Sequence, residues 1–143
     1  MQGLHLTADL HGCPADRPLM TDTDALRSLC LATIDAAGLQ PVGELFHRFA
    51  PMAGGSADAP VGITHEGMHA PVGITGVVLL AESHLAVHTW PEIASVTLDV
   101  YVCNLGADNS ARAHTLMAGL VAAFEPARVE RHALRRGQPG GPA

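Results

Sequence analysis

The serine of the segment Glu82-Ser83-His84 could carry the most unusual chemistry in this chain. Its hydroxyl can attack the carbonyl carbon of the preceding residue, and this attack converts the peptide bond into an ester. Elimination from the ester leaves dehydroalanine, and hydrolysis of its imine tautomer by water then releases ammonia and leaves a ketone at a new N-terminus. Backbone strain and hydrogen-bond donors around the carbonyl would assist the attack. Because a serine in such a setting is more often an ordinary turn residue, self-cleavage between Glu82 and Ser83 is a hypothesis.

The chain contains no lysine, since all 8 of its Lys and Arg residues are arginine. An enzyme that decarboxylates an amino acid usually joins its substrate to an electron sink as a Schiff base, and pyridoxal phosphate needs a lysine to hold it. Pyridoxal phosphate chemistry is therefore excluded. A ketone formed from Ser83, a pyruvoyl group, would supply an electron sink without lysine.

Two histidines and a cysteine could move protons near Ser83. His84 and His88 lie on one face of an expected strand, and an imidazole transfers protons near neutral pH. This pair cannot share a metal ion, because four residues of ideal strand separate the two by roughly 13 Å. Cys103 faces the polar side of another expected strand, where a thiol could protonate the carbon left after CO2 departs. The alternatives are structural histidines and a small buried cysteine.

The segment His65-Glu66-Gly67-Met68-His69 matches the letters of the H-E-x-x-H zinc motif. That motif works where a helix places both histidines on one face. Here a glycine interrupts it, and Pro60 and Pro71 flank it. A zinc hydrolase is therefore disfavoured, and no metal cofactor is expected.

The elements that must position these residues follow from hydrophobic periodicity and capping residues. Strands are predicted over residues 4–10, 42–49, 74–81, 84–90, 95–103 and 127–134. Two helices are predicted: one begins within 21–24 and ends near Ala37, and one begins at Asp108 or Asn109 and ends near Phe124. Residues 50–73 read as a loop, which contains the repeat of 59–64 at 70–75, and residues 135–143 read as a frayed tail.

This order of elements predicts a two-layer α/β sandwich of the α+β type, in which a largely antiparallel sheet carries two helices on one face. The Glu82–Ser83 bond would lie where two extended segments meet. The sheet face without helices must be covered or must carry polar function, which favours a homodimer or an active site there.

Composition limits the other classes of protein. At 143 residues, with 48% hydrophobic and 15% charged residues, the chain is one folded domain. The net charge of −6 disfavours a nucleic-acid partner and is compatible with a cationic ligand, although an ordinary acidic protein would also carry it. No signal peptide is visible, and the longest aliphatic run, 76–81, is too short to cross a membrane. Three cysteines without a CxxC pair are typical of reduced thiols in a cytoplasmic protein.

The segment from Glu82 to Glu92 reads ESHLAVHTWPE and resembles the processing site of the bacterial S-adenosylmethionine decarboxylases, which reads close to E-S-H-L-x-I-H-T-W-P-E. The processing motif is highly specific, and the resemblance spans most of the chain. Supporting segments are His5-Leu6 with Ala8-Asp9, Phe46-His47-Arg48-Phe49, Gly73-Ile74-Thr75-Gly76-Val77 and the strand that ends at Cys103.

The resemblance implies a single self-processing domain over residues 1–143, cleaved into a chain of residues 1–82 and a chain of residues 83–143. The cofactor would be the pyruvoyl group derived from Ser83. The implied product is the decarboxylated aminopropyl donor of polyamine and spermidine synthesis. The implied partners are a small cationic amino-acid-type substrate and a second copy of the chain.

The same resemblance implies a role for each matching residue. Ser83 becomes the pyruvoyl group that forms the Schiff base, His88 transfers a proton in processing, and Cys103 donates the proton in decarboxylation. The remaining implied residues are Glu82 and Thr75 in processing, Phe49 in adenine stacking and Glu92 in ribose binding.

Two departures from the family pattern bear on the substrate. The family runs almost directly from the Phe-His-x-Phe strand to the Gly-Val-Ser/Thr-Gly segment, whereas this chain has an insertion over residues 50–73. The cysteine lies in Tyr101-Val102-Cys103-Asn104 rather than in Phe-Thr-Cys-Gly. Arginine or ornithine is therefore the alternative substrate, with Asp58 or Glu66 as the acid for its distal cation. A non-catalytic binding or regulatory module on the same fold is the third hypothesis.

Overall fold

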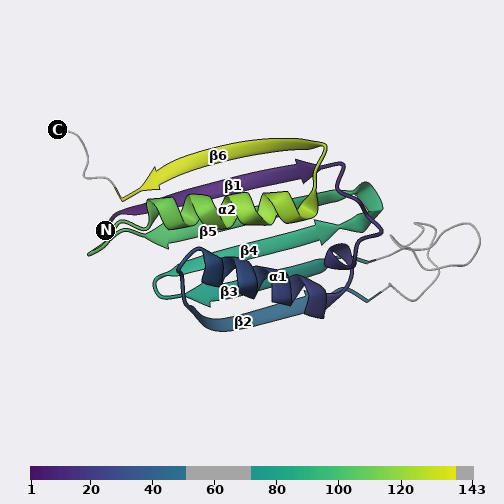
Figure 1. Ribbon diagram of the computed structural model, residues 1–143, viewed down its shortest axis with the longest axis horizontal. Coiled ribbons are helices and arrows are strands. Elements are labelled where there is room, and N and C mark those ends of the chain that lie inside the picture. Colours follow the sequence, from purple (N-terminus) through teal and green to yellow (C-terminus); the bar gives the residue numbers. More distant parts are fainter. Residues whose placement is uncertain (51–71, 138–143) are drawn as a thin grey trace, which may run out of the picture.

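A six-stranded sheet and two α-helices form the described part of the chain, residues 1–50 and 72–137 of a computed structural model (Figure 1). Every pair of neighbouring strands is antiparallel, and the strand order is β2-β3-β4-β5-β1-β6. The elements are β1 (Gly3–His11), the 3-10 turn η1 (Pro18–Met20), α1 (Thr23–Ala36), β2 (Pro41–Arg48), β3 (Ile74–Leu80), β4 (Ser83–Trp90), the 3-10 turn η2 (Pro91–Ile93), β5 (Ser95–Cys103), α2 (Ser110–Phe124) and β6 (Arg128–Arg136).

The two helices lie side by side across the same face of the sheet, which confirms the predicted two-layer sandwich (Figure 1). Helix α1 packs against β2 and β3, and α2 packs against β1 and β5. Alternation along each strand decides which side chains enter this layer. In β5 the buried residues are Val96, Leu98, Val100 and Val102. Burying each such side chain contributes about 1.5–3 kcal/mol, so the aliphatic core stabilises the fold with few aromatic residues.

Local signals fix the ends of the helices. Asp22 caps α1, because its carboxylate accepts hydrogen bonds from the backbone N–H groups of Asp24 (2.9 Å) and Ala25 (3.4 Å). Gly38 follows the helix at a φ of 75°, in the left-handed region that favours glycine. At α2, Asp108 accepts a hydrogen bond from the backbone N–H of Ser110 at 2.9 Å, and this bond lowers the pKa of the Asp108 carboxyl.

The sheet face opposite to the two helices, named here the open face, is covered by no element of residues 1–50 and 72–137. Its side chains are half-buried or exposed, whereas their neighbours in the strands are buried in the core. It carries polar and ionisable groups from three adjacent strands: His5, Thr7, Asp9 and His11 on β1; Thr97, Asp99, Tyr101 and Cys103 on β5; His84 and His88 on β4.

The C-terminal strand is longer than the sequence predicted. Arg135 and Arg136 belong to β6, where they pair with Leu4 and Gly3, so the predicted tail over 135–143 is wrong at its first two positions. Pairing with β1 extends β6 to Arg135 and Arg136, although these two residues are polar and exposed. Among the helices of the described residues, none has the length and apolar composition that a membrane span requires.

Candidate active site

Ser83 lies at a tight turn between two central strands. It is the first residue of β4 and pairs with Leu80, so Ala81 and Glu82 alone form the connection from β3. Glu82 has a φ of 53°. A non-glycine residue in the left-handed region costs on the order of 1–2 kcal/mol, so the backbone next to the Glu82–Ser83 bond is strained.

Cys103 lies directly beside this turn, although it is 20 residues away along the chain. Its backbone N–H donates a hydrogen bond to the Ser83 hydroxyl oxygen at 3.0 Å. The Cys103 sulfur is half-buried and accepts a hydrogen bond from the backbone N–H of Leu105 at 3.4 Å. The structure therefore brings together the predicted nucleophile and the predicted proton donor.

The other two cysteines differ from Cys103 in their surroundings. Cys13 and Cys30 are buried in the core. Burial raises the pKa of the Cys13 thiol. Burial, with a smaller contribution from the Glu44 carboxylate, raises the pKa of the Cys30 thiol to about 12. Both thiols therefore stay protonated near neutral pH and act as small apolar side chains.

A groove of about 720 Å³ runs over the open face beside Ser83. Its volume lies in the range of about 300–1,000 Å³ that is typical of small-molecule sites. Apolar side chains from β2 and β3 line one part of it, and polar side chains from β1, β4, β5 and β6 line another. The lining residues that matter below are Val77, Leu79, Glu82, Ser83, His5 and His84. The groove therefore offers space beside the candidate nucleophile for a small-molecule ligand.

His88 and Thr75 form a second group, which lies away from Ser83. The Thr75 Oγ1 and His88 Nδ1 atoms are 3.0 Å apart, and the two residues face each other across β3 and β4. The His88 ring also stacks on Trp90 at 5.8 Å. His88 lies five positions beyond Ser83 along β4, a separation of roughly 16 Å in an extended strand. A proton cannot pass directly between these two side chains in one chain, because transfer needs a contact of about 3 Å.

Phe49 and Glu92 belong to the same end of the sheet as His88. Phe49 follows β2, and its backbone N–H donates to the Gly73 carbonyl oxygen at 3.1 Å. Its ring is 51% exposed and packs edge-on against His47. Glu92 lies in η2, just after β4, and is exposed. Both side chains are therefore accessible to a ligand.

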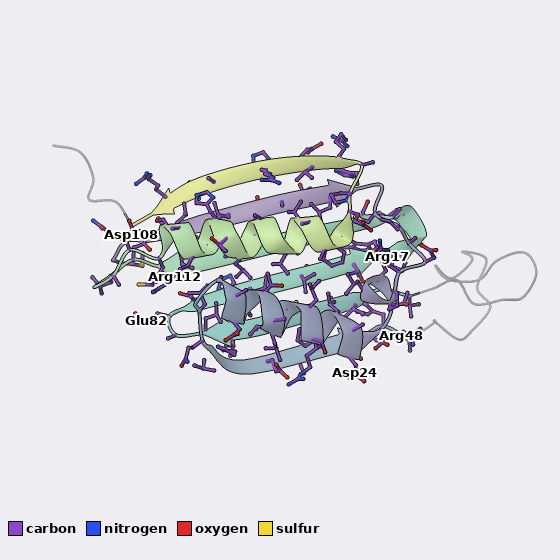
Figure 2. The ribbon with its side chains drawn as sticks, viewed as in Figure 1. Arg17, Asp24, Arg48, Glu82, Asp108 and Arg112 are labelled. Carbon is purple, nitrogen blue, oxygen red and sulfur yellow. The ribbon has the colours of Figure 1, made fainter. Side chains whose placement is uncertain are left out.

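The predicted site residues thus separate into two groups at opposite ends of the sheet. Figure 2 shows Glu82 at the end where α2 begins, near Asp108 and Arg112, and shows Arg48 at the other end. The Ser83 group comprises Glu82, Ser83 and Cys103, and the His88 group comprises Phe49, Thr75, His88 and Glu92. Within one chain, the expectation that His88 lies beside Ser83 is wrong, because a strand carries its successive residues steadily away from its first one.

Several sequence predictions fall outside the described residues. These are the H-E-x-x-H match at 65–69, the first copy of the repeat at 59–64 and the first two residues of its second copy at 70–75, the inserted loop from position 51 to 71, and the candidate acids Asp58 and Glu66. They stay predictions.

One polar cluster on the open face was not predicted. The Asp99 carboxylate oxygen Oδ1 lies 2.7 Å from His5 Nε2 and 3.3 Å from His84 Nε2. His5 and Asp99 are 94 residues apart. Each lies at a polar position of an alternating strand, but the sequence held no signal for which strands are neighbours.

Comparison with known proteins places this arrangement in a family. The sequence model described as S-adenosylmethionine decarboxylase matches residues 4–137. A protein of Aquifex aeolicus named S-adenosylmethionine decarboxylase proenzyme is 31% identical over 135 residues, which cover 94% of this chain and 81% of that protein. A protein of the same name from Archaeoglobus fulgidus is 28% identical, with 94% and 97% covered. The crystal structure of the adenosylmethionine decarboxylase from Aquifex aeolicus superposes with a TM-score of 0.74 at 29% identity, covering 99% of this chain and 95% of that chain.

Proposed function

This chain belongs to the S-adenosylmethionine decarboxylase family, and from that membership we propose that it is a proenzyme that cleaves itself and then decarboxylates S-adenosylmethionine. It is proposed to be a pyruvoyl-dependent carboxy-lyase that supplies the aminopropyl donor for polyamine synthesis. The observation that carries the proposal is the turn at Glu82–Ser83, where a strained residue precedes a serine whose oxygen is held by the Cys103 backbone.

Self-cleavage follows from the chemistry of this turn. The Cys103 backbone N–H donates a hydrogen bond to the Ser83 oxygen, so it orients the hydroxyl without removing its proton. The left-handed conformation at Glu82 stores strain that opening of the peptide bond would release. Attack by Ser83 on the Glu82 carbonyl carbon would give the ester, and elimination would separate residues 1–82 from residues 83–143.

Processing also needs a group that moves protons, and we propose that His88 and Thr75 of a second chain supply it. Within one chain the two groups lie roughly 16 Å apart. Two copies could stack their open faces about 10 Å apart, as packed sheets do. A two-fold axis between the sheets and perpendicular to the strands would lay the Ser83 end of each β4 over the His88 end of the other. One isologous dimer would then complete two identical sites.

The same dimer would assemble the substrate site. The pyruvoyl group would supply the Schiff base carbonyl and the electron sink for loss of CO2. Cys103, beside Ser83, would return a proton to the substrate carbon. Phe49 and Glu92, from the His88 group of the partner copy, would bind the adenine ring and the ribose hydroxyls at the far end of the groove. The apolar wall formed by Val77 and Leu79 would exclude water from the reacting bond.

The test is mass spectrometry of the purified protein under denaturing conditions, followed by CO2 release from S-adenosylmethionine, arginine and ornithine. We expect two fragments with the boundary between Glu82 and Ser83, and turnover of S-adenosylmethionine alone. Ser83→Ala, which removes only the hydroxyl, is the matched control and should stay intact and inactive. A chain that stays whole after long incubation would support a non-catalytic module. Turnover of arginine or ornithine without S-adenosylmethionine would refute the substrate and leave the processing chemistry standing.

A further inference from the structure

Three ionisable side chains meet on the open face without a role in the proposed reaction. They are His5 on β1, Asp99 on β5 and His84 on β4, and one ligand atom from each lies within 4.8 Å of the other two. The closest pairs are Asp99 Oδ1 with His5 Nε2 at 2.7 Å and with His84 Nε2 at 3.3 Å. Two imidazole nitrogens and a carboxylate oxygen therefore converge on one point.

Strand pairing holds this cluster in place. His5 and His84 both pair with Tyr101, one from each side of β5, so the two histidines lie at the same level of the sheet. Asp99 lies two residues along β5 on the same face and reaches between them. The Tyr101 ring packs against both imidazoles, at 6.1 Å from His5 and 5.8 Å from His84. A site built on central strands and braced by a packed ring is preorganised, unlike one on a loop.

The chemistry of the three groups fits a divalent transition-metal ion. Two histidines and one carboxylate form a common ligand set for such ions, and they leave coordination positions open. Zinc–nitrogen and zinc–oxygen bonds of about 2.0–2.2 Å place tetrahedral ligands a little over 3 Å from one another. The His84–Asp99 separation of 3.3 Å is close to that value, and the His5–Asp99 separation of 2.7 Å, a hydrogen-bond distance, would widen by a few tenths of an ångström. Without an ion, His5 Nε2 and Asp99 Oδ1 are within hydrogen-bond distance, and His84 Nε2 lies within ion-pair distance of the same oxygen.

We propose that His5, His84 and Asp99 bind a divalent transition-metal ion such as Zn²⁺ on the open face. In a single chain the side chains are 22%, 42% and 38% exposed respectively, so an ion can reach them before two copies stack their open faces. His5 and His84 line the groove beside Ser83, and the open coordination positions would therefore be available to water or to an anionic ligand in that groove. The sequence analysis expected no metal cofactor, and it did not consider Asp99 as a ligand.

The test is metal binding by the full chain, measured by calorimetry with Zn²⁺ and by visible absorption with Co²⁺. The background should carry His65→Ala and His69→Ala, so that the H-E-x-x-H match cannot contribute. We expect one ion per chain. Losing a residue that only orients a metal ligand weakens binding by up to about 100-fold, so Asp99→Asn, which removes a ligand itself, should weaken binding by at least about 100-fold. Co²⁺ should give no thiolate charge-transfer band, which separates this site from binding at Cys103.

The matched control is His11→Asn. His11 lies on the same strand and face as His5 and approaches a carboxylate, Glu130, at 3.9 Å, but it belongs to no metal-ligand group among the described residues. This change should leave the affinity unaltered. The measurements should be repeated with Ser83→Ala, so that binding is tested in a chain that cannot process and failure of cleavage is distinguished from failure of the metal site. No uptake by either form, or equal uptake by Asp99→Asn, would overturn the proposal and leave the cluster as a hydrogen-bonded network.

Discussion

Complementation between two inactive variants gives the sharpest test of the proposed dimer. Ser83→Ala removes the nucleophile, and His88→Ala removes the proposed proton carrier. If His88 acts on the Ser83 of its own chain, no mixture of these variants can process. If it acts on the partner, a mixed dimer contains one complete site, formed by Ser83 of the His88→Ala chain and His88 of the Ser83→Ala chain.

The structure sets the size of the effect. The gap of roughly 16 Å between Ser83 and His88 along one strand leaves no direct contact to lose within a chain. In the homodimer of His88→Ala, loss of general acid–base catalysis should slow processing about 100- to 10,000-fold. Equal amounts of two chains that pair at random in an isologous dimer place about half of the His88→Ala chains in mixed dimers. About half of all the His88→Ala chains should therefore cleave at close to the normal rate.

The assay is co-expression with different affinity tags, followed by denaturing mass spectrometry of each tagged chain. Only the His88→Ala chain should appear as fragments, and the Ser83→Ala chain should stay whole. Co-expression of His88→Ala with Thr75→Ala is the control. In the proposed dimer His88 and Thr75 reach each Ser83 from the same partner chain, so every site of this mixed dimer lacks one of the two and cleavage should stay slow. Wild-type cleavage by His88→Ala alone, or no cleavage in the mixture although mixed dimers form, would refute this reasoning.

Four further predictions follow from the same geometry. Iodoacetamide under native conditions should modify Cys103 before the two buried cysteines, and Cys103→Ala should cleave yet decarboxylate poorly; equal labelling of all three thiols would contradict this. Phe49→Ala and Glu92→Gln should lower kcat/KM for S-adenosylmethionine roughly ten- to a hundred-fold, from about 1 kcal/mol of stacking and about 1–3 kcal/mol of hydrogen bonding, with cleavage unchanged by mass spectrometry. The buried Thr89 hydroxyl accepts a hydrogen bond from the Ile74 N–H at 2.9 Å and donates one to the Met20 carbonyl oxygen at 2.8 Å. Thr89→Val should therefore lower the unfolding free energy, measured by urea denaturation, by about 1–3 kcal/mol for each backbone group that loses its partner. Folding raises the pKa of the Cys30 thiol from 9.0 to about 12. The thiol therefore ionises in the unfolded chain first, and the unfolding free energy should fall as the pH rises above about 9. In Cys30→Ala the accompanying fall in Tm should be smaller.

The local elements could be predicted because each carries its own signal. Alternation from Ser95 to Cys103 specifies a strand with one apolar face, and the structure buries that face against the helices. Asp22 supplies a cap, and Gly38 supplies the left-handed residue that ends α1. The short connection at Glu82 follows from two apolar strands that leave no room for a longer loop. Fold class then follows from the order of these elements.

The arrangement of the site could be predicted only in part, because it depends on distances between strands. The pairing of His5 with Asp99 requires β1 to lie beside β5, and no residue pattern in the chain encodes that order. The separation of Ser83 from His88 was within reach of the sequence. The spacing of 3.3 Å per residue that excluded a metal between His84 and His88 applies equally to Ser83 and His88. The prediction for His88 assumed that residues close in the sequence are also close in space.

The length of the processing motif gains a physical meaning from this separation. A helix would separate Ser83 from His88 by only about 7.5 Å along its axis, whereas a strand separates them by roughly 16 Å. In the proposed dimer, each end of β4 serves a different site, so the spacing between Ser83 and His88 must match the overlap of two stacked sheets. Adding two residues would keep every side chain on its face but move His88 by about 6.6 Å, more than a hydrogen bond can bridge. If the proposed dimer forms, its dimensions would set this spacing, and one short segment would supply both the nucleophile of one site and the proton carrier of the other.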